Sequence, residues 1–287
     1  MSTAVFDFDS AARPNGGREV SRSRGLAVCE VLGFGGNDDR CGFDFDSAAR
    51  PRNHATPRPH PRPRNRETAE PRYHAISLPA RTFTGDFWFT HAEGDRLWFA
   101  LGDVAGKGLP AAIVMAMIQE ELEHRVTSCA TAGCDPATTM KRLDGFLKPL
   151  LPSNRFATAV IGWLDDDGGV TLVNAGHCPP MIVHADGSIE QIDSTGPVVG
   201  IVPNARWCST TLTLDPGDLI VLYSDGVIES PSLDGNDFGV EGIVRALPRS
   251  TCARTVAASI VDSATRHAGG GSRYDDLTVM VIGAMVR

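Results

Sequence analysis

The sequence lacks the features that mark membrane proteins, secreted proteins and cysteine-based metal sites. No apolar run approaches the roughly 20 residues that a membrane-spanning helix needs, and the first residues show no signal peptide. Seven cysteines are scattered without a C-x-x-C pair, which is typical of free thiols in a reducing compartment. The formal net charge is -8, so the chain as a whole is not built to bind nucleic acid or an anionic membrane. We therefore expect a cytoplasmic protein with no membrane partner.

Residues 1–72 differ in composition from the rest of the chain. The segment Phe-Asp-Phe-Asp-Ser-Ala-Ala-Arg-Pro occurs at 6–14 and recurs letter for letter at 43–51. Between 51 and 71 the chain is rich in proline, arginine and histidine, a composition that favours extended, unpacked backbone. We predict a disordered leader and basic linker at 1–72 and a globular domain at 73–287. The basic linker leaves open a nucleic-acid tether, which we regard as the weaker interpretation.

From residue 73 onward the apolar pattern predicts many short strands and a few helices. Hairpin spacing and turn residues favour antiparallel pairing of the strands, and the helices carry capping and proline signals such as Asp135-Pro136. The pattern therefore predicts an α+β fold in which helices cover sheets. The strands are expected at 73–79, 82–89, 96–100, 156–164, 170–174, 181–184, 189–192, 207–214, 219–223 and 277–284, and the helices at 110–126, 136–150, 240–247 and 253–267.

Several aspartates share one local setting, at a predicted strand end or start beside glycine or another acid. They are Asp86, Asp103, Asp225 and the pair Asp275 and Asp276. If they converge, two carboxylates about 5 Å apart repel each other by about 3 kcal/mol at an effective dielectric near 20. Several such pairs would rival the whole stability of a domain, roughly 5–15 kcal/mol. Such a cluster needs cations, and ligands that are all oxygen suit Mg²⁺ or Mn²⁺, which can activate water and clamp a phosphoryl group.

Eight short motifs occur in a fixed order along the globular part. They are Gly-Asp-Phe-Trp at 85–88, Gly-Asp-Val-Ala-Gly-Lys-Gly at 102–108 with Pro-Ala-Ala at 110–112, Asn-Ala-Gly-His-Cys-Pro-Pro at 174–180, Gly-Pro-Val-Val-Gly at 196–200, Pro-Gly-Asp at 216–218, Tyr-Ser-Asp-Gly-Val at 223–227 with Glu229, Phe-Gly at 238–239, and Asp-Asp-Leu-Thr at 275–278. In these motifs the chain resembles the SpoIIE-type (stage II sporulation E) branch of the metal-dependent type 2C protein phosphatases. The resemblance covers residues 73 to 286 and implies a sandwich of two antiparallel sheets flanked by helices.

The resemblance also implies a site with two Mn²⁺ or Mg²⁺ ions. Asp103 would bridge both ions, and Asp86 would hold one of them directly or through water. Asp103 and Asp225 would act in catalysis through a metal-bound water that attacks the phosphorus, with no covalent phosphoenzyme. Matching the motifs gives the ligand set Asp86, Asp103, the carbonyl of Val104, Asp225 and Asp275, with Asp276 as the alternative for the last position.

The activity that the resemblance implies is that of a protein phosphatase acting on phosphoserine or phosphothreonine. The usual substrate in the family is a phosphorylated regulatory protein, the antagonist of an anti-sigma factor. The alternative is a catalytically idle domain that acts as an interaction module in a sigma-factor pathway. No carboxylate ligand position has been replaced by a neutral residue, which argues against that alternative. The oligomeric state stays open, because the apolar helix face at 113–117 could pair with a second copy, although we expect it to belong to the core.

Some positions depart from the family pattern. Thr84 stands where the family commonly has glycine, and Phe89 where an aspartate often follows. Ala105 occupies the place of the histidine that serves as general acid in eukaryotic type 2C enzymes. No arginine is evident for holding the substrate phosphate; Lys107 could attract it, or could point to solvent. His177 could contact the site, or could buttress the turn before the two prolines.

Overall fold

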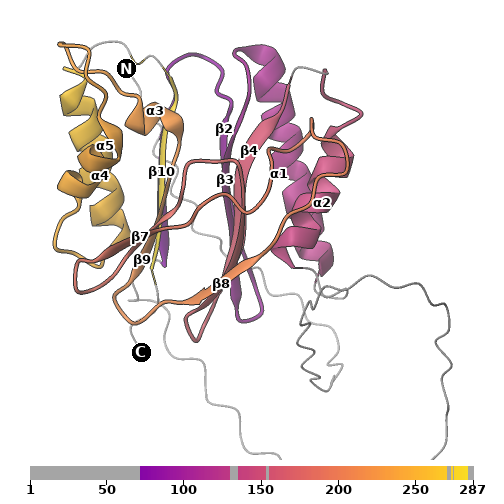
Figure 1. The fold of residues 1–287 in the computed structure, drawn as a ribbon, viewed down its shortest axis with the longest axis horizontal. Helices are drawn as coiled ribbons and strands as arrows, with labels where there is room; N and C mark the ends of the chain where they lie inside the picture. The colour runs from indigo at the N-terminus through magenta and orange to yellow at the C-terminus, as the bar shows by residue number, and fades with distance from the viewer. Residues whose placement is uncertain (1–71, 130–134, 153–154, 270–272, 274, 284–287) are drawn as a thin grey trace, which may run out of the picture. The chain divides into compact units, whose positions relative to one another are not determined.

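The computed structural model describes residues 72–129, 135–152, 155–269, 273 and 275–283. The predicted leader, with its duplicated segment, lies outside the described residues apart from Arg72. Within the described part, two five-stranded antiparallel sheets pack face to face and helices cover their outer faces (Figure 1). This arrangement confirms the predicted sandwich of two antiparallel sheets flanked by helices.

Sheet 1 has the strand order β1-β10-β9-β6-β7, and sheet 2 has the order β2-β3-β4-β5-β8. The strands of sheet 1 are β1 (Tyr73–Leu78), β6 (Met181–Val183), β7 (Ile189–Gln191), β9 (Leu219–Tyr223) and β10 (Leu277–Gly283). Those of sheet 2 are β2 (Asp86–Glu93), β3 (Arg96–Val104), β4 (Ala157–Asp165), β5 (Gly169–Ala175) and β8 (Thr210–Thr213).

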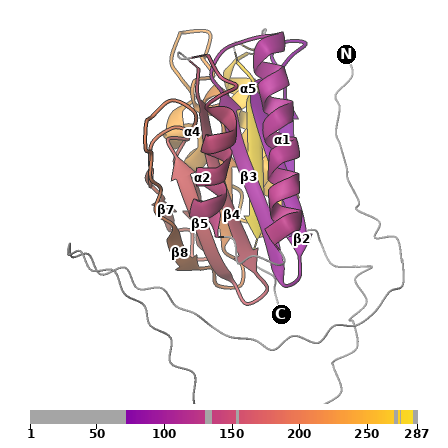
Figure 2. The same cartoon turned by 90° about the vertical axis from the view of Figure 1, so that its right-hand side faces the viewer.

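Each sheet is covered by its own helices. Helices α1 (Leu109–Cys129) and α2 (Pro136–Leu147) lie against sheet 2 (Figure 2). The short α3 (Asp225–Ile228), α4 (Gly239–Ala246) and α5 (Ala253–His267) lie on the side of sheet 1 (Figure 1). None of the described helices is long and apolar enough to cross a membrane.

The core has three apolar layers because both faces of each sheet are covered. Along β3, Leu97, Phe99 and Leu101 face the layer between the sheets, while Trp98 and Ala100 face α1 and α2. This alternation follows from the two-residue repeat of a strand. It also explains why β3 is apolar along most of its length.

Helix α2 shows how local signals set an element boundary. The side chain of Asp135 accepts a hydrogen bond from the backbone N–H of Thr138 at 3.0 Å, and Pro136 occupies the first helical position. Both features follow the sequence prediction, since an aspartate N-cap satisfies an orphan donor and proline has no N–H to leave unpaired. The helix ends at Leu147, three residues earlier than expected.

Three expectations need correction. The second strand begins at Asp86 rather than at 82, because pairing with β3 sets its start. Strand β3 runs on to Val104, so Asp103 lies within a paired strand rather than in the turn after it. Ile113 is 52% exposed, so it does not belong to the core; its neighbours Val114 and Met115 pack there instead.

Candidate metal centre

Four of the predicted site aspartates line one cavity at the end of the sandwich where β3 leads into α1. The cavity has a volume of about 300 Å³, and its lining includes Asp103, Asp225, Asp275 and Asp276. Asp103 comes from the end of β3, Asp225 opens α3 directly after β9, and the last two precede β10. Segments far apart in the sequence thus bring four carboxyl groups together.

Asp86, the fifth aspartate, lies behind the cavity. It is directly opposite Asp103 in the pairing of β2 with β3, and only 5% of it is exposed. The Oγ1 of Thr278 donates a hydrogen bond of 2.5 Å to its Oδ2. The pKa of Asp86 is raised to about 8, chiefly by burial; the hydrogen bond from Thr278 opposes the rise and the charge of Asp103 adds to it.

The carboxylates of the cavity disfavour one another's charge. Burial, together with the charges of Asp225, Asp275 and Asp276, raises the pKa of Asp103 to about 7. Burial and the charge of Asp275 likewise raise the pKa of Asp225. A divalent cation would reverse this balance, because an opposite charge favours the ionised form of a carboxyl group.

Asp275 and Asp276 are neighbours with different surroundings. Oδ1 of Asp276 accepts a hydrogen bond from the backbone N–H of Ala80 at 2.7 Å, and its Oδ2 accepts one from that of Gly85 at 3.1 Å. The side chain of Asp275 is 47% exposed, and the Nζ of Lys107 lies 3.3 Å from its Oδ2. Asp276 is thus engaged by the backbone, whereas Asp275 faces the open side of the cavity.

The donor set suits a hard cation in its chemistry. A Cβ on Gly85 would lie 2.6 Å from Oδ1 of Asp103 and 2.9 Å from the carbonyl oxygen of Val104, so these two oxygens border the space that Gly85 leaves open. Carboxylate and carbonyl oxygens are ligands that Mg²⁺ and Mn²⁺ prefer. As the side chains stand, no group of three or more acidic, histidine or cysteine residues among the described residues is arranged to hold an ion. Hydrogen bonds to the protein engage Asp86 and Asp276 in this arrangement.

His177 supports the site from behind rather than lining it. Its Nδ1 lies 2.8 Å from Oγ1 of Thr158, which does line the cavity. Its backbone N–H donates to Oδ1 of Asn174 at 2.8 Å, and Nδ2 of Asn174 donates back to the carbonyl of His177 at 3.2 Å. Burial lowers the pKa of His177 to about 4, so the imidazole stays neutral. Of the two roles considered for this residue, the buttressing of its turn is the one observed.

The departures from the family pattern are accommodated locally. The hydroxyl of Thr84 accepts a hydrogen bond from the backbone N–H of Asp86 at 3.0 Å. Phe89 packs against the apolar layer under α1 and α2. Ala105 lines the cavity without adding an ionisable group.

Arg81 is a cavity residue that we did not expect from the sequence. It lines the cavity together with Lys107 and is exposed. The sequence had offered no arginine for the substrate phosphate, and Arg81 is a candidate for that role. The one sequence signal for Arg81 was its position five residues before Asp86. That position brings Arg81 to the cavity only if the loop between β1 and β2 folds over it. Only the tertiary structure shows that the loop does so.

The chain is similar to several known proteins. The family model described as Stage II sporulation protein E (SpoIIE) matches residues 93–284. Protein IcfG of Synechocystis sp. is 29% identical over 236 residues, which cover 72% of this chain and 37% of IcfG. Phosphoserine phosphatase RsbU of Bacillus subtilis is 30% identical over 163 residues, which cover 56% of this chain and 48% of RsbU. The chain thus spans less than half of the length of these curated relatives.

A solved structure shares the fold as well. The SiaA-PP2C domain of Pseudomonas aeruginosa matches with a TM-score of 0.66 at 18% sequence identity. The match covers 75% of this chain and 86% of that domain. At this level of identity the likeness concerns the fold, and it extends over essentially all of the described residues.

Proposed function

The chain belongs to the stage II sporulation protein E (SpoIIE) family, and from this premise we propose that residues 73–287 form a metal-dependent protein phosphatase. The reaction would be hydrolysis of a phosphoserine or phosphothreonine ester by an activated water. The observation that carries the proposal is the convergence of Asp103, Asp225 and Asp275 on one cavity that also presents Arg81 and Lys107. Grouped carboxylates with cations at the same opening suit a phosphate monoester and the metal ions that activate it.

The ligand assignment follows from the position of each carboxylate. Asp103, the carbonyl of Val104 and Asp225 would hold the ions, with Asp86 acting directly or through water. When bound, Mg²⁺ or Mn²⁺ would supply Lewis acidity and an activated water. We assign the last ligand position to Asp275, because its carboxylate faces the open cavity. Asp276 is the weaker candidate, since two backbone N–H groups already bind its oxygens.

Other cavity residues would act on the substrate. Among the described residues, no hydrogen bond or ion pair engages the guanidinium of Arg81, so it can attract a phosphate group to the cavity. Lys107 would add positive charge when it leaves Asp275, which it contacts at 3.3 Å. Because Ala105 is not ionisable, the proton for the leaving serine or threonine oxygen would come from water.

The substrate class follows from family membership rather than from the cavity. We propose a phosphorylated regulatory protein of the anti-sigma-factor antagonist type, in keeping with the similarity to RsbU, which is named a phosphoserine phosphatase. A cytoplasmic location and a possible homodimer stay predictions. The second candidate, a catalytically idle interaction module, is favoured by one observation: hydrogen bonds to the protein already engage Asp86 and Asp276.

The test is turnover by the purified full chain. Hydrolysis of p-nitrophenyl phosphate and of a phosphoserine peptide would be measured with Mn²⁺, with Mg²⁺ and with EDTA, beside Asp103→Asn. We expect metal-dependent turnover that falls by about 100-fold or more in the variant, since a carboxylate that would hold the metal is lost. Equal turnover by both proteins, or the absence of turnover with every metal from folded protein, would contradict the proposal. The second outcome would favour the interaction module.

A further inference from the structure

One wall of the cavity is made by the segment that connects β1 to β2, residues 79–85. Four of its residues line the cavity, namely Ala80, Arg81, Phe83 and Gly85. Another part of the lining comes from the β3–α1 connection, which contributes Ala105, Gly106 and Lys107. The 79–85 segment therefore shares the cavity with the aspartates, and a substrate bound there would contact it.

A single carboxylate holds this segment at both ends. Asp276 accepts the backbone N–H of Ala80 through Oδ1 at 2.7 Å and that of Gly85 through Oδ2 at 3.1 Å. Asp276 is only 8% exposed. Hydrogen bonds from N–H groups to an ionised carboxylate are stronger than neutral ones, and they gain further when water is excluded. The carbonyl of Gly85 also accepts a hydrogen bond from the N–H of Val104 at 3.2 Å, so Asp276, just before β10, is the side chain that holds the wall while this backbone bond holds one end of it.

The held segment presents two groups that a phosphorylated peptide could use. Arg81 is a cation with no partner among the described residues. Phe83 is a large apolar side chain that is 45% exposed although it lies in the cavity wall. Phe156 lines the same cavity and adds a second aromatic ring. A phosphorylated serine or threonine beside an apolar residue fits this combination of one cation and two rings.

We propose that Asp276 is a positioning residue that fixes the 79–85 wall, and that this wall selects phosphorylated segments with an apolar residue next to the phosphorylated one. The inference rests on the proposed phosphatase function and adds to it the part of the substrate that is recognised. It separates the roles of two adjacent acids, because Asp275 would hold the metal and Asp276 would hold the wall. Aspartate suits the second role because its two oxygens can accept from two donors at once.

The test compares two substitutions of the same size at adjacent positions, Asp276→Asn and Asp275→Asn. Asparagine at 276 keeps one acceptor but turns the other into an N–H₂ group that opposes a backbone donor. Mn²⁺ affinity would be measured by calorimetry, and access to the wall by trypsin cleavage after Arg81, in the full chain. Cleavage after Lys107 serves as the control for Asp276→Asn, since among the described residues no hydrogen bond or ion pair joins Asp276 to the β3–α1 connection.

We expect Asp276→Asn to bind Mn²⁺ within about twofold of the unchanged protein and to be cleaved after Arg81 several-fold faster. Asp275→Asn should show the opposite pattern, with Mn²⁺ affinity about tenfold lower or worse and unchanged cleavage after Arg81. With a phosphoserine peptide that has leucine next to the phosphoserine, Asp276→Asn should raise KM more than it lowers kcat. With glycine in place of that leucine, the unchanged protein should show the higher KM and the effect of the variant should shrink.

Two results would overturn the inference. One is a loss of Mn²⁺ affinity in Asp276→Asn as large as that in Asp275→Asn. The other is a cleavage rate and a leucine preference that both stay unchanged. Ala80→Pro removes the backbone N–H that donates to Oδ1 of Asp276 and keeps both aspartates. The same measurements on this variant test the proposal if Asp276→Asn does not fold. If the unchanged protein hydrolyses no phosphoester, the phosphatase proposal fails, whereas cleavage and metal affinity still report on Asp276.

Discussion

Thr278 of sheet 1 donates a 2.5 Å hydrogen bond to Asp86 of sheet 2, so a buried contact ties the two sheets together beside the candidate metal centre. The hydroxyl of Thr278 also lies 3.0 Å from that of Ser77, and its backbone N–H donates to Oγ of Ser224 at 3.0 Å. Thr278 is fully buried. A donor in this position fixes the direction in which the carboxyl group of Asp86 points.

Replacement of this donor should destabilise the fold and loosen the site. Thr278→Val keeps the shape but leaves the buried carboxyl group of Asp86 without its partner, at a cost of about 1–3 kcal/mol. Thr278→Ser keeps the hydroxyl and should cost less. Urea unfolding in EDTA measures the stability, and Mn²⁺ titration of the folded variants measures the site. A Thr278→Val protein that is as stable as the unchanged protein, or more stable than Thr278→Ser, would contradict this role of the hydroxyl.

Without metal, the cavity aspartates should lower the free energy of unfolding, as expected for buried like charges. The raised pKa of Asp103 means that its ionised form is penalised in the fold, so at neutral pH the carboxylate destabilises the metal-free protein. Asp103→Asn in EDTA should therefore raise the free energy of unfolding, by about 1–3 kcal/mol. The exposed Asp262→Asn is the control and should change it by less than about 0.5 kcal/mol. A destabilised Asp103→Asn protein would contradict this account.

Bound metal should stabilise the folded protein. A ligand that binds only the native state adds about 2.7 kcal/mol at 100 times its Kd. The midpoint of thermal unfolding should thus rise as Mn²⁺ is added and fall back with EDTA. Asp225→Asn should show a smaller rise, because a carboxylate that lines the cavity is lost. A midpoint of thermal unfolding that does not change with millimolar Mn²⁺ would argue against a metal centre in this protein.

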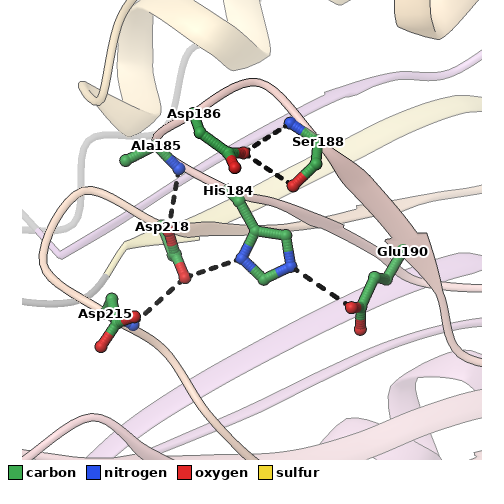
Figure 3. Close-up of polar contacts among 7 residues, drawn as sticks. All are labelled: His184, Ala185, Asp186, Ser188, Glu190, Asp215 and Asp218. Atoms are coloured by element: carbon green, nitrogen blue, oxygen red, sulfur yellow. Dashed lines mark hydrogen bonds and ion pairs between the residues drawn. The ribbon is translucent and has the colours of Figure 1, made fainter.

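A second polar cluster lies outside the cavity, around Asp218 (Figure 3). The carboxylate of Asp218 accepts hydrogen bonds from the backbone N–H groups of Ala185 at 2.9 Å and Asp215 at 3.1 Å, and lies 2.9 Å from Nδ1 of His184. The hydrogen bond to Asp218 raises the pKa of His184 above its ordinary value of 6.5. Burial pulls the pKa of Asp218 upward, but its three partners outweigh burial and hold it below 3.8.

These shifts give a defined dependence of stability on pH. The contribution of His184 is complete below pH 6.5 and is lost as the pH rises through its folded pKa. The contribution of Asp218 is present above pH 3.8 and is lost as the pH falls through its folded pKa. His184→Gln should therefore lower the free energy of unfolding more at about pH 5.5 than at about pH 8.5. Urea unfolding at both pH values checks this, and an equal loss at both would refute it.

Gly102 should tolerate no side chain. A Cβ there would lie 2.3 Å from the carbonyl oxygen of Thr158 and 2.6 Å from Cζ of Phe87. Gly102→Ala should therefore cost about 1–3 kcal/mol through overpacking beside Asp103. Gly145→Ala is the matched control, since nothing lies within 4 Å of its Cβ and the residue is inside α2. It should stabilise the protein by about 0.5–1 kcal/mol, and urea unfolding compares the two.

The sequence alone determined most of the elements and the residue types of the site. Strand β9 and helix α5 have the predicted bounds, 219–223 and 253–267, because an unbroken apolar run and a clear helical repeat leave few alternatives. The aspartates were identified by their motifs, and Asp103, Asp225 and Asp275 do meet at one cavity. Local chemistry sufficed for these features.

Only the tertiary structure decided what depends on contacts between distant segments. The start of β2 is set by the pairing of Asp86 with Asp103, and no local propensity marks it. Arg81 lines the cavity from a loop whose backbone donates two hydrogen bonds to Asp276, a contact that spans almost the whole domain. The pKa values and hydrogen bonds of Asp86, Asp103 and Asp276 depend on neighbours that lie far away in the sequence. The fold therefore follows from local patterning, whereas the division of work among the aspartates follows from packing.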